Sequence, residues 1–85
     1  MSESPELEVR KFSAALEEEE LSWHRDREDR LIILSSGSGW LLQLDEKKPE
    51  SMEPDKGYYI PAGVWHRLLK MPDASDLVVK ILKRV

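Results

Sequence analysis

The chain contains no cysteine among its 85 residues. Disulfide bonds, thiolate metal ligands and thiol nucleophiles are therefore all excluded. No apolar run approaches the roughly 20 residues that span a bilayer, and no glycine loop of the phosphate-cradling kind is present. A domain this small buries only about 60–65% of its unfolded surface, so without crosslinks it depends on packing and self-association. We therefore expect one domain over residues 1–85, and a homodimer.

Positive charge is also in short supply, with 13 Lys and Arg residues against 17 Asp and Glu residues, a net charge of -4. Nucleic-acid phosphates require a basic face, so we predict neither a nucleic-acid nor a membrane partner. Residues 1–5 lack the positive start and the apolar stretch of a secretory signal. We expect these residues to be flexible and the protein to be cytoplasmic.

Short runs of strand-forming residues alternate with turns rich in Gly, Pro and Asp about every 8 to 12 residues. This pattern predicts an all-β sandwich or a closed barrel. Ser13 can cap a single helical turn, and the glycines at 37 and 39 indicate a hairpin. The expected strands cover residues 6–12, 21–26, 30–35, 40–44, 51–53, 58–60, 66–70 and 77–85.

Residues 59–67, Tyr-Ile-Pro-Ala-Gly-Val-Trp-His-Arg, resemble the second motif of the cupins, in which P-x-G-x-x-H places a histidine on the strand after a turn. The first cupin motif, H-x-H followed at fixed spacings by Glu and Gly, is similar in spacing to His24, Asp26, Arg30 and Gly37. The two motifs with their linker cover residues 24–70. The resemblance implies a small antiparallel jelly-roll β-barrel of the cupin type.

The resemblance also has departures with chemical consequences. In metal-binding cupins, two histidines and a glutamate of the first motif join the second-motif histidine around one ion. Here His24 and His66 are kept, Asp26 stands at a histidine position, and Arg30 stands at the glutamate position. A guanidinium about 4 Å from a divalent ion is repelled by roughly 8 kcal/mol at an effective dielectric near 20. Asp55 stands at the usual glycine position before the second motif, where it can adopt a left-handed backbone.

Strand alternation places His24 and Asp26 on one face, and Arg30 on one face of the next strand. If the resemblance holds, these side chains and His66 meet at the barrel mouth. Our leading hypothesis is that His24, Asp26, Arg30, Trp40 and His66 bind a small polar or anionic molecule, for which the forked guanidinium suits a carboxylate or phosphate. Trp40 has core packing as its simpler role.

Three alternatives stay open. Arg30 can simply pair with Asp26, Glu28 or Asp29, leaving a polar network without a ligand. The chain can be a metal-dependent oxygenase, isomerase or epimerase that holds a divalent transition metal with His24, Asp26 and His66, joined by Glu28 or Asp29. Arg30 disfavours that ion. It can also be an interaction module, with two outward tryptophans at positions 23 and 65.

Overall fold

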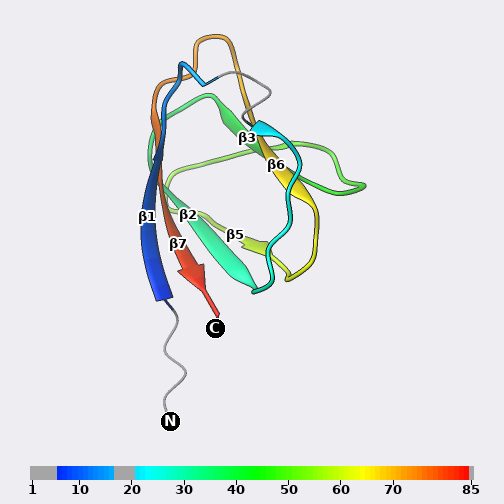
Figure 1. Cartoon of the computed structure of the whole chain (residues 1–85). Coiled ribbons are helices and arrows are strands. Elements are labelled where there is room, and N and C mark those ends of the chain that lie inside the picture. Colours follow the sequence, from blue (N-terminus) through cyan, green and yellow to red (C-terminus); the bar gives the residue numbers. More distant parts are fainter. Residues whose placement is uncertain (1–5, 17–20, 85) are drawn as a thin grey trace.

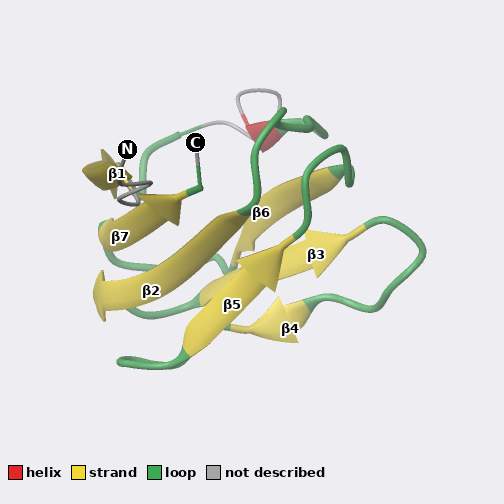
Figure 2. Ribbon diagram, turned by 90° about the horizontal axis from the view of Figure 1, so that it is seen from below, coloured by secondary structure: helices red, strands yellow, loops and turns green. Residues whose placement is uncertain are grey.

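The computed structural model describes residues 6–16 and 21–84, so the expected flexibility of residues 1–5 lies outside the described residues. The described chain forms two antiparallel sheets that face each other as two layers (Figures 1 and 2). One sheet has the strand order β1-β7-β2-β5 and the other β4-β3-β6. The strands are β1 (Glu6–Phe12), β2 (Arg30–Ser36), β3 (Trp40–Leu44), β4 (Glu50–Ser51), β5 (Gly57–Ile60), β6 (His66–Lys70) and β7 (Leu77–Lys83). Within these ranges, no helix has the length and apolarity needed to cross a membrane.

The core lies between the two sheets and is built from alternate residues of each strand. Because successive side chains of a strand point to opposite faces, every second residue of β2, β3 and β7 faces inward. Trp40 and Leu34 are the largest of the side chains that are almost fully buried, each 1% exposed. The rest of the buried apolar set is Ile32, Leu42, Met52, Tyr58, Ile60, Leu77, Val79 and Ile81.

Most of the expected strands are confirmed, but the strand expected at residues 21–26 is wrong. In that segment His24 alone makes a bridge, with His66 at the start of β6. The pairing stops there because the residues before His66 belong to the turn at Pro61–Gly63, where Gly63 N donates to Asp26 O at 2.8 Å. The Ser13 turn is confirmed, since Leu16 N donates to Ser13 O at 3.1 Å.

The glycine-rich segment at residues 36–39 is not a hairpin, because β2 and β3 belong to different sheets. It carries the chain from one layer to the other. Gly37 has φ 116°, and a Cβ there would lie 2.5 Å from Asp76 O, so the crossing requires a residue without a side chain. Asp55 has φ 63°, which confirms the left-handed backbone expected at that position.

The expected closure of the barrel is also wrong for the described residues, since the two sheets stay separate. In the described part of the chain, two isolated bridges add to the sheets, His24 with His66 and Leu34 with Pro54. Strand β4 has two residues and the 21–26 segment pairs at one, so neither offers enough backbone groups to continue a ladder. The inner space therefore stays accessible beside His24 and His66.

Candidate functional site

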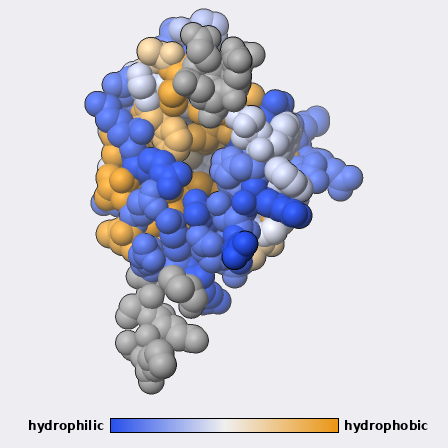
Figure 3. All heavy atoms as spheres, viewed as in Figure 1, coloured by the Kyte–Doolittle hydropathy of each residue, from blue (hydrophilic) through white to orange (hydrophobic). Residues whose placement is uncertain are grey.

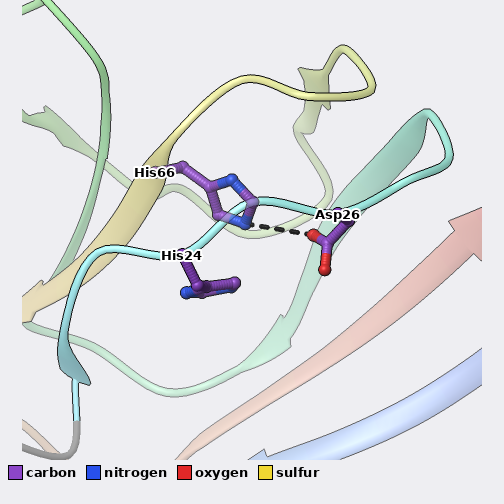
Figure 4. A group of neighbouring side chains, drawn as sticks. All are labelled: His24, Asp26 and His66. Carbon is purple, nitrogen blue, oxygen red and sulfur yellow. Dashed lines mark ion pairs between the residues drawn. The ribbon is translucent and has the colours of Figure 1, made fainter.

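Two histidines far apart in sequence are joined at the site by backbone pairing. His24 N donates to His66 O at 3.0 Å, and His66 N donates to His24 O at 2.8 Å. Directly opposed residues of an antiparallel pair share one face, and the imidazole centroids accordingly lie 4.2 Å apart at 64°. Figure 4 shows the two rings side by side, with Asp26 facing His66.

Each imidazole is oriented by a carbonyl two residues earlier in the chain. His66 Nδ1 lies 2.9 Å from Val64 O, and His24 Nδ1 lies 3.3 Å from Ser22 O. A carbonyl oxygen only accepts, so each Nδ1 carries the hydrogen and donates. When such a ring is neutral, its lone pair is on Nε2. Metal-binding histidines are typically fixed in this way by their second nitrogen.

Asp26 completes a group of three potential ligands with the histidines. One ligand atom from each of His24, Asp26 and His66 lies within 4.8 Å of the others. Asp26 Oδ2 is 3.3 Å from His66 Nε2. This oxygen is buried and has no hydrogen-bond partner among the described residues.

Burial keeps His66 neutral. The side chain is 5% exposed, and burial lowers the pKa of His66 below 6.5, with the charges of His24 and Arg30 acting in the same direction. The Val64 carbonyl and Asp26 oppose this shift. In the neutral state, His66 Nε2 and Asp26 Oδ2 lie 3.3 Å apart with no proton between them.

Arg30 is engaged by carboxylates of its own chain. Its Nη2 lies 2.9 Å from Glu28 Oε1 and 3.3 Å from Asp26 Oδ1, and its Nε donates to Glu28 at 3.2 Å. These hydrogen bonds lower the pKa of Glu28. The pairing of Arg30 with Asp26 and Glu28, which the sequence suggested, is therefore present.

Asp29 takes a different partner from the one the sequence suggested. Its Oδ1 accepts a hydrogen bond from Ala62 N at 2.8 Å. That hydrogen bond is the largest cause of a lowered pKa of Asp29, and a hydrogen bond with the Tyr59 side chain is the second. Asp29 thus ties the segment that carries Asp26 and Arg30 to the turn that precedes His66.

A cavity of about 90 Å³ adjoins the histidines. Its polar wall is formed by Arg10, Arg30, His24 and His66, and its remaining lining is mostly apolar, including Leu42. In Figure 3, hydrophobic atoms are visible between hydrophilic ones on the face that is drawn. Sequence reasoning did not identify Arg10 and Phe12, which also line the cavity, because β1 reaches the site only by pairing with the distant β7.

Trp40 is not brought to this cavity. It is 1% exposed in the core, and its Nε1 donates to Ser75 O at 2.6 Å. Its position supports the packing role and gives no support to the expected ligand contact. The outward direction expected for Trp23 and Trp65 is confirmed, since they are 37% and 41% exposed.

No protein-family model matches the sequence, and no curated protein matches it. Solved structures do match. The DMSP lyase DddQ from Ruegeria pomeroyi DSS-3 has a TM-score of 0.81 and 17% identity, over 99% of this chain and 40% of the lyase. A cupin family protein with a double-stranded β-helix fold from Methanocaldococcus jannaschii has a TM-score of 0.76 and 13% identity, covering 98% of this chain and 72% of that one.

A cupin domain from Bordetella pertussis Tohama I has a TM-score of 0.69 and 18% identity, over 100% of this chain and 85% of that one. The chain spans 40% of the length of the lyase, so it corresponds to part of that protein. These identities are low while the backbone agreement is high, which is evidence about the fold. The chain has the antiparallel double-stranded β-helix fold of the small cupins.

Proposed function

We propose that this protein binds a divalent transition-metal ion through His24, Asp26 and His66, and a small polar molecule in the adjoining cavity. The observation that carries the proposal is the unsatisfied pair formed by His66 Nε2 and Asp26 Oδ2, 3.3 Å apart. Two groups that both present lone pairs repel each other in a buried setting unless a cation lies between them. Burial disfavours a proton on His66 as that cation. A metal ion satisfies both groups.

The donor set fits such an ion. Two imidazoles and one carboxylate are typical ligands of iron, manganese, nickel and zinc, and they leave coordination positions open for a substrate. Both rings are held with their Nδ1 atoms engaged by carbonyls, which presents Nε2. Once bound, a divalent ion supplies a Lewis acid that polarises an oxygen of the bound molecule.

Arg30 is the feature that opposes a metal, and Glu28 offsets it. The guanidinium lies 2.9 Å from Glu28 Oε1, and the side chain of Arg30 is 12% exposed. Together with Asp26, Glu28 gives the cluster two carboxylates against one guanidinium. A dication therefore meets a cluster whose formal charge is negative.

The size of the cavity limits the bound molecule. A water molecule needs about 15 Å³ of such space, so 90 Å³ holds roughly six non-hydrogen atoms. The polar wall favours a carboxylate or hydroxyl group, and the apolar lining favours a short hydrocarbon part. The fold likeness to a DMSP lyase supports an enzymatic role for such a site.

A second candidate function is metal-free binding of a small anion. It is favoured by the two guanidinium groups, of Arg10 and Arg30, that line the cavity. Each already contacts a carboxylate of its own chain, Arg10 with Glu8 and Arg30 with Glu28, so an anion would have to compete with these pairs.

Metal content decides between the two functions. The full chain, without a histidine tag or chelator, is analysed for bound metals beside Asp26→Asn and His66→Leu. The matched control is Asp45→Asn, an exposed carboxylate outside the site. We expect near-stoichiometric metal in the wild type and the control, and loss of it in both site variants. Metal-free wild type that binds a small carboxylate, with binding lost in Arg30→Gln, would establish the second function instead.

A further inference from the structure

Strand β1 is an edge strand with an unusual surface. In the described part of the chain it pairs with β7 on one side, and its other edge has no strand beside it. Its outward residues Leu7 and Val9 are 58% and 62% exposed. Figure 3 shows hydrophobic atoms at the margin where Figure 1 places β1. Edge strands usually carry charges or bulges that prevent pairing, and two exposed aliphatic side chains do the opposite.

The charges of β1 are arranged so that the strand complements itself. Its sequence runs Glu-Leu-Glu-Val-Arg-Lys-Phe from residue 6 to residue 12, with acidic residues before Val9 and basic residues after it. Glu8 and Arg10 of one chain already form an ion pair. In an antiparallel pair of two such strands centred on Val9, each Glu8 also lies opposite Arg10 of the other copy, so the two ion pairs face each other in reversed order. Opposite charges placed directly across a ladder stabilise it.

The neighbouring registers are less favourable. Paired residues of the two strands point to the same face of the joined sheet only when the two-fold axis passes through a residue, so the possible registers differ by whole residues. A centre at residue 8 places Glu8 opposite Glu8, and a centre at residue 10 places Arg10 opposite Arg10. Like charges across a ladder destabilise it, so the charges select the register centred on Val9.

We propose that two copies of this chain pair antiparallel through their β1 strands, with Val9 opposite Val9, and so join their four-stranded sheets into one. The contact is closed by a two-fold axis, and each strand supplies the backbone groups that the other lacks. Arg10 and Phe12 line the cavity, so the same contact fixes one wall of each candidate site.

The absence of cysteine allows a direct test of the register. Cα atoms of an opposed antiparallel pair lie about 4.5–5.5 Å apart, within the range of about 4.4–6.8 Å that a disulfide spans. Val9→Cys should therefore form a disulfide between copies under mild oxidation. Leu7→Cys should not form one with itself, because four residues separate the two positions along the strand, about 13 Å. Lys11→Cys should behave in the same way.

Mixing Leu7→Cys with Lys11→Cys should give the crossed disulfide, since residue 7 of one copy lies opposite residue 11 of the other. An exposed loop variant, Asp73→Cys, measures disulfides formed by random collision. Sedimentation of the wild type should give twice the chain mass of 9.9 kDa, and Val9→Lys should raise the dimer dissociation constant by about tenfold or more.

A monomeric wild type at the highest soluble concentration would overturn the proposal. Val9→Cys crosslinking no faster than Asp73→Cys would overturn it too, as would faster crosslinking of Leu7→Cys or Lys11→Cys with itself. Leu7 and Val9 are exposed, so we expect variants at these positions to stay folded, and the melting temperature of each variant checks this.

Discussion

Shortening the side chain of Leu42, which lines the cavity, tests the location of the cavity through the free energy of unfolding. Leu42 is 3% exposed and lines the cavity, whereas Leu34 is 1% exposed and packs in the core away from it. A buried Leu→Ala change costs about 2.7–5.0 kcal/mol, and the cost rises with the volume of the hole that is left. Leu42 borders space that is already empty, so its methyl groups make fewer contacts, and we expect a cost near 2–3 kcal/mol for Leu42→Ala.

The matched change Leu34→Ala should cost about 4–5 kcal/mol, because its side chain is surrounded on all sides. A domain of this length has a stability of about 4–13 kcal/mol, so the pair Leu42→Val and Leu34→Val provides a milder version if Leu34→Ala does not fold. Each kcal/mol lowers the melting temperature by about 4–8 °C. Urea unfolding followed by tryptophan fluorescence measures both variants. A cost for Leu42→Ala equal to or above that of Leu34→Ala would refute the position of the cavity.

Three further outcomes follow from single residues. Burial lowers the pKa of His66 below 6.5, so on acidification the histidine is protonated in the unfolded chain before it is protonated in the folded one. The stability of chelator-treated protein should therefore fall as the pH drops from about 6.5 to the folded pKa. The midpoint of urea unfolding should follow this fall in the wild type and should not do so in His66→Leu. The hydrogen bond from Ala62 N lowers the pKa of Asp29 below 3.8, so the stability that the ionised carboxylate contributes is lost as the pH falls through that lower pKa. In Asp29→Asn, the free energy of unfolding should therefore depend less on pH below about 3.8. Gly37→Ala should lower the melting temperature strongly, because the added Cβ would lie 2.5 Å from a backbone oxygen. Gly63→Ala should lower it less, because a Cβ there has nothing within 4 Å and only the positive φ opposes it.

Much of the fold could be predicted because its signals are local. The alternation of strand-forming runs and turns located the strands at residues 30–35 and 40–44, and the Pro and Gly of residues 61–63 placed the turn before His66. The spacing of the first motif correctly brought His24, Asp26 and Arg30 together with His66.

The remaining features depend on contacts between distant parts of the chain. Whether two glycines make a hairpin or a crossing between sheets depends on which strands pair, and the local sequence of residues 36–39 is compatible with both. The segment before Asp26 has a strand-like composition, but β6 offers it one residue to pair with. Arg10 joins the cavity through the pairing of β1 with β7, about 70 residues away along the chain.

A metal titration followed at the imidazoles tests the central claim most directly, because both histidines of the chain belong to the site. Chelator-treated protein with isotope-labelled histidine nitrogens is titrated with Zn²⁺ and observed by NMR. We predict that the Nε2 signals of His24 and His66 both shift and saturate near one ion per chain, while both Nδ1 atoms keep their hydrogens. In Asp26→Asn the affinity should fall by about 10–100-fold or more. Nε2 signals that stay unchanged in excess Zn²⁺, or a shift of His24 without His66, would contradict a metal site formed by these three residues.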